Sequence, residues 1–582
     1  MISSSNILRK PNRKEIVFAA FFLAVLVFNI WRAPYGEVWD DEAYYLTVPY
    51  RMMQGDSFLV HEWSMGQMFG FILLPLVKLY VAVFQSTDGI YLASRYAYVV
   101  THTLTSLYIF LRLRNINFSA AAVSALIYFI FSYGNLMTLN YNTMGIGLML
   151  ICWLTMAMSR GKAWEYMLSG LCFAAAVLCS PFLVMVYLAY TLAVLIIKGT
   201  KKQAVVLGDA LLVRSWLLFT ASCAILATAF FLRTILNGDF LMIFRTLPEL
   251  LQEDYHPRTG TFWFIREFIA AFSKQNGYFW QVLAGSLVLC LVIAMDRRAK
   301  GRRALYLIAA ACLAGLFALP YVLMYREVNY LLFPVNILGF FAYLLCEKKN
   351  YRLFWLMYVP GAIYWLAINM ASNLGLLAIS GASAVNIPAS MVFVFELISE
   401  LREDAGAGRG FMRLVCNVAA LCSVGVVLMC TAVMLDTRME RAVFSDPIDT
   451  LTERIEMGAA KGVICTPEQK ALYEGEYTAL APLREKAEGK VLYFDRNSIR
   501  HIEDEKINAH HNMWFAYKSI ENAEAKLEIY WELLPERKPD YIYLNDEGLS
   551  DPEVYNMFCT AFDYDYTIIE LEHGAFFELD WH

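Results

Sequence analysis

The feature that most constrains the fold of this 582-residue chain is a series of apolar runs, each long enough to cross a membrane. A spanning helix needs roughly 17–25 mainly apolar residues. Only 17% of the residues are charged, against about 25% in soluble domains. We therefore expect a polytopic α-helical membrane protein. The sequence predicts thirteen spans, at residues 16–32, 91–111, 118–134, 143–159, 164–180, 182–198, 215–233, 278–295, 304–324, 328–346, 353–371, 382–399 and 413–435.

One further apolar run, residues 67–84, decides the orientation of everything that follows it. Lys and Arg concentrate in short cytoplasmic loops. If 67–84 does not span and the N-terminus is cytoplasmic, all the basic loops are cytoplasmic. Lys78 and Pro75 within the run also suit a helix at the membrane surface. We predict a juxtamembrane helix at 67–84 and a multi-pass plasma-membrane protein with a cytoplasmic N-terminus. The basic loops lie at residues 112–114, 160–162, 198–202, 297–303, 348–352 and 402–413.

This topology places three longer segments outside the cell: residues 33–90, 234–277 and 436–582. The composition becomes polar after Asp436, which divides a membrane domain, residues 1–435, from a soluble tail. Short β-prone runs in the tail alternate with helical patterns such as 519–534, an order typical of an α/β domain. The predicted strands lie at 462–466, 490–494 and 541–544.

The tail offers no convincing metal or nucleotide site. Cys465 and Cys559 could pair if the tail is extracytoplasmic, although two cysteines alone fix nothing. His510 and His511 read as a surface pair without a third ligand. No glycine-rich phosphate fingerprint follows the predicted strands. Because the basic residues lie only in short clusters between apolar runs, we expect no nucleic-acid partner.

Three consecutive acids, Asp40, Asp41 and Glu42, directly follow the first span. Charge near a bilayer is costly and often functional, although a solvated loop is the simpler interpretation. A carboxylate at the outer surface could deprotonate an acceptor hydroxyl attacking a sugar. Outside the cell nucleotide sugars are absent, but the membrane can present polyprenyl-phosphate sugars. Arg326, in a short exterior loop, could stabilise the departing phosphate through two parallel hydrogen bonds.

Two stretches carry a resemblance to a known family. Residues 41–45, Asp-Glu-Ala-Tyr-Tyr, and residues 50–56, ending in Gly-Asp, resemble the first exterior loop of GT-C glycosyltransferases. Within this superfamily, the two stretches are most similar to those of protein O-mannosyltransferases and of the lipid A aminoarabinose transferase. Residues 326–334 resemble the family's donor-phosphate stretch. The resemblance implies a GT-C fold with juxtamembrane helices in loop 33–90. It also implies inverting transfer from a polyprenyl-phosphate sugar to a lipid, glycan or protein acceptor.

The resemblance also assigns roles to individual residues. It implies that Asp41 is the catalytic base and that Glu42 supports it. Asp40 is an extra neighbour that could take over this role, or raise the pKa of Asp41 through like-charge repulsion. Arg326 would contact the donor phosphate, with Tyr330 close to it.

The chain departs from the family pattern in two places. Asn142 stands in the second exterior loop where the family has an acid, so it could orient a sugar hydroxyl but supplies no charge. A Lys-Pro-Pro segment is replaced by residues that include His61 and Glu62, which could contact phosphate or a metal ion. His256 and Arg258, in exterior loop 234–277, could join them. No cofactor is assigned, and a divalent metal ion stays an open alternative.

Two functions from other classes compete with the transferase. A transporter or flippase for lipid-linked sugars would need polar residues at mid-membrane depth and paired broken helices in matching halves. The sequence has few ionisable residues deep in the spans and no matching halves, which favours the enzyme. A scaffold whose tail binds a partner protein is the second alternative.

Overall fold

The computed structural model of the protein describes most of the chain. The described residues are 12–37, 41–64, 66–198, 208–238, 240–251, 265–266, 269–270, 278–296, 298–325, 328–371, 375–407, 410–442, 446–486, 488–495, 497–513 and 520–581.

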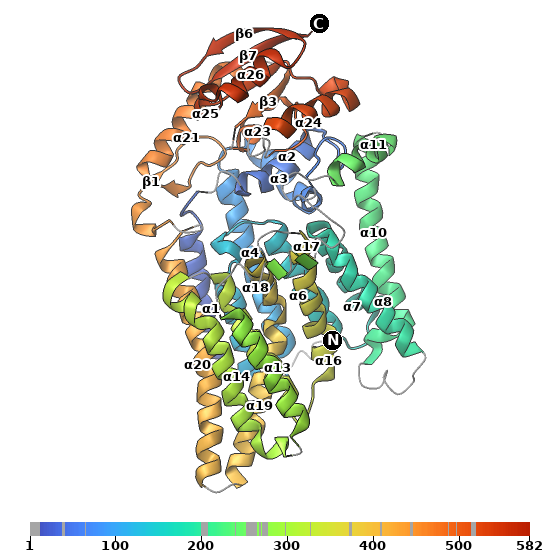
Figure 1. Ribbon diagram of the computed structural model, residues 1–582, viewed down its shortest axis with the longest axis vertical. Coiled ribbons are helices and arrows are strands. Elements are labelled where there is room, and N and C mark those ends of the chain that lie inside the picture. The colour runs from blue at the N-terminus through green and yellow to red at the C-terminus, as the bar shows by residue number, and fades with distance from the viewer. Residues whose placement is uncertain are drawn as a thin grey trace.

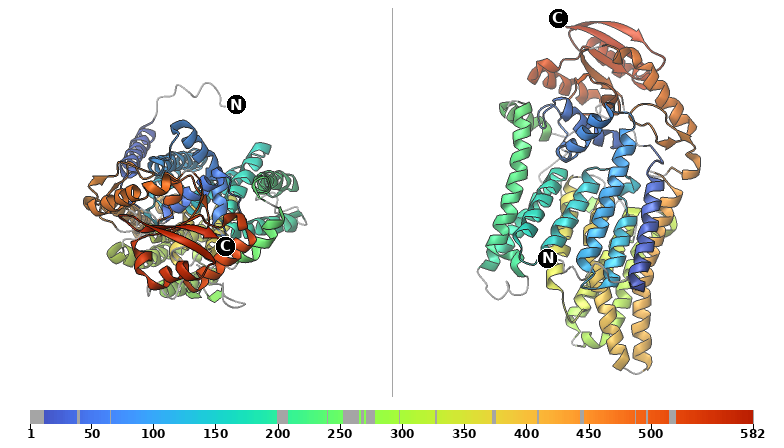
Figure 2. Two further views of the ribbon diagram at one scale, coloured as in Figure 1. Left: turned by 90° about the horizontal axis from the view of Figure 1, so that it is seen from above. Right: turned by 180° about the vertical axis from the view of Figure 1, so that it is seen from behind.

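A helical bundle makes up the larger part of the molecule, and a C-terminal domain with a β-sheet covers one end of it (Figure 1). Seen from above, this domain lies over the bundle end (Figure 2). The long helices of the first half are α1 (Arg13–Arg32), α4 (Ile90–Leu113), α5 (Phe118–Ile130), α6 (Tyr141–Ala157), α7 (Ala163–Cys179), α8 (Val184–Lys198) and α10 (Val213–Asn237). Those of the second half are α13 (Phe279–Met295), α14 (Arg303–Pro320), α15 (Phe333–Leu345), α17 (Val359–Ala371), α19 (Ile387–Ala407) and α20 (Gly410–Glu440).

Each of the thirteen predicted spans falls largely on helical residues. By length and apolar composition, seven helical segments among the described residues could cross a membrane, and five shorter apolar helices accompany them. The helical membrane architecture is thus confirmed, whereas the number of thirteen spans stays a prediction. The seven segments are Arg13–Arg32, Gln67–Phe84, Val213–Asn237, Arg303–Met324, Val328–Leu345, Leu376–Gly406 and Gly410–Glu440.

Although the segment Gln67–Phe84 is long enough to span, its helix α3 (Gly70–Phe84) lies at the bundle end that carries the C-terminal domain (Figure 1). The segments on both sides of α3 hydrogen-bond to that domain. Before it, the Trp63 backbone N–H donates to the His511 carbonyl at 2.7 Å. After it, the Gly89 N–H donates to the Gly458 carbonyl at 3.0 Å. A helix through the bundle would bring only one of its ends to that domain, so the geometry agrees with the predicted juxtamembrane helix.

The C-terminal domain contains a five-stranded mixed sheet with the order β4-β3-β5-β7-β6. The first three of these strands are parallel, and β7 runs antiparallel to both β5 and β6. The predicted strands 490–494 and 541–544 are confirmed as β3 and β5, and the run 462–466 contains β2. The strands are β1 (Glu453–Arg454), β2 (Ile464–Cys465), β3 (Lys490–Phe494), β4 (Ile507–Asn508), β5 (Tyr541–Leu544), β6 (Tyr564–Glu570) and β7 (Ala575–Trp581).

Six helices complete this domain. The predicted helix at 519–534 is confirmed as α24. Leu527, Tyr530 and Trp531 of α24 are buried against Leu492 of β3 and Ile542 of β5. This packing gives the domain an apolar core of its own. The helices are α21 (Pro467–Ala479), α22 (Ala481–Arg484), α23 (Arg500–Glu503), α24 (Ile520–Leu533), α25 (Asp546–Ser550) and α26 (Pro552–Thr560).

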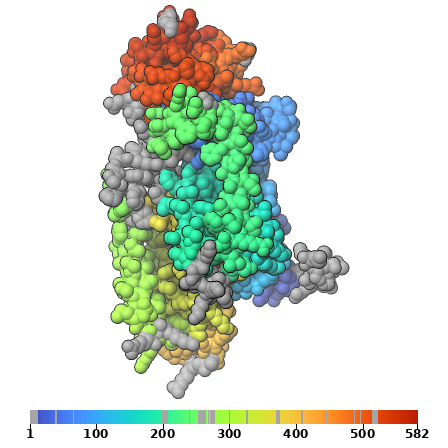
Figure 3. All heavy atoms as spheres, turned by 90° about the vertical axis from the view of Figure 1, so that its right-hand side faces the viewer, coloured from blue at the N-terminus to red at the C-terminus, as the bar shows by residue number. Residues whose placement is uncertain are grey.

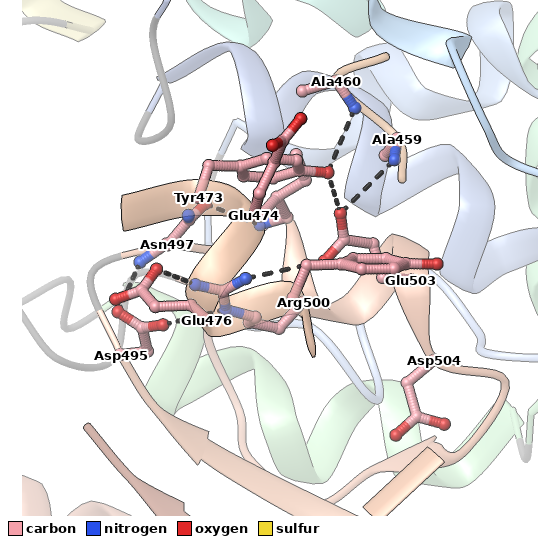
Figure 4. Close-up of polar contacts among 12 residues, drawn as sticks. Ala459, Ala460, Tyr473, Glu474, Glu476, Asp495, Asn497, Arg500, Glu503 and Asp504 are labelled. Carbon is pink, nitrogen blue, oxygen red and sulfur yellow. Dashed lines mark hydrogen bonds and ion pairs between the residues drawn. The ribbon is translucent and has the colours of Figure 1, made fainter. Parts of the chain in front are cut away.

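A buried arginine ties three parts of the C-terminal domain together (Figure 4). Arg500 of α23 bonds to Glu476 of α21, and its Nε lies 3.2 Å from Asp495, directly after β3. Its third acid neighbour, Glu503, accepts a hydrogen bond from the Tyr473 hydroxyl. Three carboxylates around one guanidinium compensate its charge from several sides, as a buried charge requires. We assign this cluster to folding.

The structure decides two points about the tail: the possible disulfide does not form, and the predicted surface histidine pair is wrong. Cys465 and Cys559 are both free thiols, because Cys465 is buried beside α2 and α4 whereas Cys559 packs with the β-sheet core. His510 and His511 are not a surface pair, since both side chains are at most 2% exposed. The His510 Nε2 lies 3.1 Å from the His501 Nε2, and the Trp63 ring contacts His511. Burial under loop 41–64 explains the error.

Polar contacts join the C-terminal domain to the first loop. Asp56 forms an ion pair with Arg51 and a second one with Arg537 of the C-terminal domain, at 2.8 Å. The Thr47 hydroxyl donates to the Ser498 carbonyl at 2.9 Å. This loop is therefore enclosed between the bundle and the C-terminal domain.

The helix α11 (Phe240–Leu251) adds a further contact from the side of the bundle (Figure 3). It continues the course of α10 upward to the C-terminal domain. There Glu249 pairs with Lys526 of α24 at 2.6 Å. The C-terminal domain is thus held at two points that are far apart in the sequence.

Gly170 provides the first test of the bundle packing. A Cβ atom there would clash with the Phe219 carbonyl oxygen and lie 3.0 Å from the Ser222 Cβ on α10. Because a helix backbone cannot yield easily, we expect Gly170→Ala to destabilise the α7–α10 pair by about 1–3 kcal/mol. Thermal unfolding in detergent measures this loss.

The matched control is Gly315→Ala on α14, where a new Cβ meets no atom within 4 Å. Alanine is the better helix former, so this variant should be at least as stable as the wild type. Equal melting temperatures for Gly170→Ala and Gly315→Ala would contradict the close α7–α10 approach.

Candidate active site

The predicted base, Asp41, is the first residue of α2 (Asp41–Gln54). Its carboxylate and that of Glu42 lie in the first turn, where the positive end of the helix dipole stabilises negative charge. From Glu42 to Met52 every residue of α2 is buried, whereas Asp41 is only half-buried. The helix thus holds Asp41 at the border of an enclosed space.

Glu42 has a structural partner that fixes the start of α2. The guanidinium of Arg95, on α4, donates to both Glu42 oxygens, at 2.8 and 2.5 Å. It also donates to the carbonyls of Ala33 and Gly36, at 3.0 and 2.8 Å. Because both Glu42 oxygens are occupied, we interpret Glu42 as a positioning residue for Asp41.

Buried tyrosines surround Asp41. The Tyr45 ring packs edge-on against Tyr141 at 5.4 Å. Burial, then Tyr141 and the Asp41 charge, raise the pKa of Tyr45 well above its usual value. The Tyr133 side chain is buried as well. These phenols therefore stay protonated and can donate hydrogen bonds.

Several buried polar groups near these tyrosines lack a protein partner. Asn329 accepts a hydrogen bond from the Gly134 N–H at 3.0 Å, yet its Nδ2 donor is unsatisfied among the described residues. Three more buried groups have no hydrogen-bond partner among the described residues: the hydroxyls of Tyr133 and Tyr364 and the Nδ2 of Asn140. Buried polar groups without partners are rare. A hydroxyl-rich ligand would satisfy them.

The structure brings Tyr330 to this cluster. It lies on the short helix η8 (Val328–Leu331), where its ring stacks on Tyr321 with centroids 4.1 Å apart. Asn329 of the same short helix accepts the Gly134 N–H, so η8 lies beside the segment that carries Tyr133. Asn142 is also buried, in the first turn of α6, and its N–H donates to the Asn140 side chain at 2.8 Å.

His61 and Glu62 lie in a different environment, under the C-terminal domain. The His61 Nδ1 accepts a hydrogen bond from the Ser57 N–H at 2.8 Å, and its carbonyl accepts one from the Tyr530 hydroxyl. Burial, and next the charge of Arg537, lower the pKa of His61 to about 4. Glu62 accepts a hydrogen bond from the Ser64 N–H at 3.3 Å. Neutral His61 thus supports the docking of the C-terminal domain.

Four predicted site residues, Asp40, His256, Arg258 and Arg326, lie outside the described residues. Among the residues that are described, no group of three or more His, Cys, Asp or Glu side chains could hold a metal ion. The structure therefore adds no support for the divalent ion.

Sequence reasoning missed several members of this site. Only Arg95 could have been found from the sequence, because it is a charged residue inside the predicted span 91–111 and such a residue usually has a partner. Tyr133, Asn140, Asn329 and Tyr364 have no such signal, since aromatic and amide residues are common at membrane boundaries.

No family model matches this chain, and a search of curated proteins found no match. Among solved structures, the chain is similar to the archaeal oligosaccharyltransferase AglB from Archaeoglobus fulgidus, in complex with an inhibitory peptide and a dolichol-phosphate. The identity is 11% and the TM-score 0.42, over 95% of this chain and 74% of that one. At these values the similarity carries no argument about function, which depends on the residues themselves.

The Glu42–Arg95 pair yields a stability prediction. Glu42→Gln removes the counter-charge of a buried guanidinium, so we expect a loss of about 3 kcal/mol in unfolding free energy. Arg302→Gln, in the exposed pair of Arg302 and Asp296 at 3.4 Å, should cost less than about 1 kcal/mol. Denaturation in detergent compares the two. A Glu42→Gln protein as stable as the wild type but inactive would indicate a catalytic role instead.

Proposed function

We propose that this protein is a membrane glycosyltransferase of the GT-C kind, which transfers a sugar from a polyprenyl-phosphate donor to an acceptor hydroxyl. The observation that supports this proposal best is the position of Asp41. It is a half-buried carboxylate at the first residue of a fixed helix, one helical turn before the buried phenol of Tyr45. A carboxylate beside buried hydrogen-bond donors suits general-base chemistry on a hydroxyl.

The proposed reaction is a single displacement. Asp41 accepts the proton of the acceptor hydroxyl while its oxygen forms a bond to the anomeric carbon. The bond from that carbon to the phosphate oxygen breaks, and its electron pair leaves with the polyprenyl phosphate. One displacement inverts the anomeric configuration. Arg326 stabilises the charge that develops on the departing phosphate.

The donor sugar is proposed to occupy the space beside Asp41. The unsatisfied donors of Tyr133, Asn140, Asn329 and Tyr364 would bind its hydroxyls. A site whose buried polar groups match particular hydroxyls rejects sugars that lack them, because those groups would then stay unpaired. Asn142 and Tyr330 contribute to the same wall, whereas Glu42 and Arg95 keep α2 in place.

The remaining assignments follow the predicted topology. The bundle end with the C-terminal domain faces the extracytoplasmic side of the plasma membrane, and the N-terminus is cytoplasmic. The acceptor is a lipid-linked or cell-surface molecule. A transporter of lipid-linked sugars would move such a molecule without forming a glycosidic bond, so product analysis separates the two functions.

The first test of this function is Asp41→Asn. Asparagine keeps the shape but cannot accept a proton, so transfer from polyprenyl-phosphate sugars should fall at least about 100-fold. The control is Asp88→Asn, an exposed aspartate of the same loop, which should retain activity. Mass spectrometry of the acceptor after incubation with a panel of donors measures both variants. Undiminished transfer by Asp41→Asn, or loss in both variants, would refute the assigned base.

A second test concerns Arg326. Arg326→Ala removes a positive charge from the proposed phosphate contact, so the apparent KM for the donor should rise about tenfold or more. The KM for the acceptor should stay constant. Arg454→Ala, on an exposed position of β1, serves as the control. A donor KM equal to that of the wild type would exclude Arg326 from phosphate binding.

A further inference from the structure

Two adjoining cavities lie away from the Asp41 cluster. The larger, about 670 Å³, is an apolar groove between α6, α8 and α17. The smaller, about 350 Å³, is lined by Lys348, Lys349, Asn350, Tyr351, Arg352 and Glu396. Tyr351 lines both cavities, so the two cavities adjoin each other. The size of the groove falls within the range of about 300–1,000 Å³ typical of ligand sites.

The Trp153 end of the groove lies far from Tyr141, although Ile363, which also lines the groove, directly precedes Tyr364 of the proposed sugar site. Trp153 is twelve residues along α6 from Tyr141 of the Asp41 cluster. Twelve residues of helix separate them by about 18 Å. Figure 1 shows α16 (Tyr351–Leu353), where the polar cavity lies, at the end of α17 that points away from the C-terminal domain. In the predicted topology this end faces the cytoplasm.

The polar cavity is basic, and its side chains carry hydrogen-bond donors. Arg352 is anchored by its Nη2, which donates to the Ser159 carbonyl and hydroxyl at 3.0 and 3.1 Å. Its buried Nε has no hydrogen-bond partner among the described residues. The ammonium of Lys349 donates to the carbonyls of Tyr343 and Leu344.

Lys348 is exposed, and its backbone N–H bonds to Glu400 at 3.1 Å. The lining of the polar cavity therefore contains three cations, Lys348, Lys349 and Arg352, and one carboxylate, Glu396. Glu400 lies next to them, but it also pairs with Arg303. The positive charge of this cavity is thus only partly compensated, and Lys348 is free to turn toward a ligand.

The groove below these charges is apolar and open to the side. Trp355 and Tyr351 are 50% and 42% exposed, as amphipathic rings at a membrane interface often are. Ala189 and Ala193 of α8 leave space opposite them. Topology alone explains why a cytoplasmic loop contains basic residues. It does not explain why an apolar groove lies next to these residues.

We propose that these two cavities together bind an anionic phospholipid of the cytoplasmic leaflet. Its phosphate lies against Arg352 and Lys348, and one acyl chain occupies the groove between α8 and α17. Basic pockets between membrane helices are suited to such head groups. The site does not depend on the proposed glycosyl transfer, because it shares no residue with the Asp41 cluster.

Thermal unfolding of the detergent-purified full chain tests this site. Phosphatidylglycerol should raise the melting temperature, whereas phosphatidylcholine and inorganic phosphate should not. Lys348→Ala should weaken the apparent affinity for phosphatidylglycerol about fivefold, the effect of one basic residue near an anionic lipid. Arg352→Gln should weaken it at least as much. Ala193→Phe, which fills the groove without changing charge, should also reduce the shift.

Lys14→Ala is the matched control, because Lys14 is exposed on α1 outside both cavities. It should keep the full response. Equal shifts with phosphatidylcholine would show that no head group is recognised, and an equal shift with phosphate would indicate a free-anion site. A response to polyprenyl phosphate but not to phosphatidylglycerol would assign the groove to another lipid. Unchanged affinity in both Lys348→Ala and Ala193→Phe would likewise overturn the proposal.

Discussion

The buried ion pair of Glu42 and Arg95 determines where the proposed catalytic carboxylate lies. Both charges are removed from water, so each depends on the other for compensation. Arg95 also donates hydrogen bonds to the carbonyls of Ala33 and Gly36, in the segment that follows α1. One guanidinium therefore joins α4, the start of α2 and the intervening loop. Asp41 is the residue next to this junction, which therefore fixes the start of its helix.

The sequence predicted the helical architecture well because membrane spans are local features. A run of apolar residues specifies a helix wherever its neighbours lie. Strands β3 and β5 and the helix α24 were found for a similar reason, since each has a clear period or composition. The juxtamembrane placement of the helix in 67–84 depends on the charge of distant loops, which is a constraint on the whole chain, and it stays a prediction.

The candidate site was predicted less completely because its parts meet through tertiary contacts. Glu42 looked like a member of an acidic triplet until Arg95 was seen beside it. His510 and His511 looked exposed because nothing local indicates that His501 would lie against the first and Trp63 against the second. The polar groups of Tyr133, Asn329 and Tyr364 come from three separate segments, and no spacing rule connects them. The sequence alone could name Asp41 and Tyr330, but not the surface that links them.

The arrangement of α3 has a consequence for how the molecule sits in a bilayer. Leu79, Val83 and Phe84 on this helix are each 62% exposed, and both of its flanking segments are bonded to the C-terminal domain. Such an apolar face is stable at the boundary between head groups and acyl chains. It therefore sets the height of the C-terminal domain above the hydrocarbon layer. Asp41 would keep a constant depth relative to lipid head groups even in membranes of different thickness.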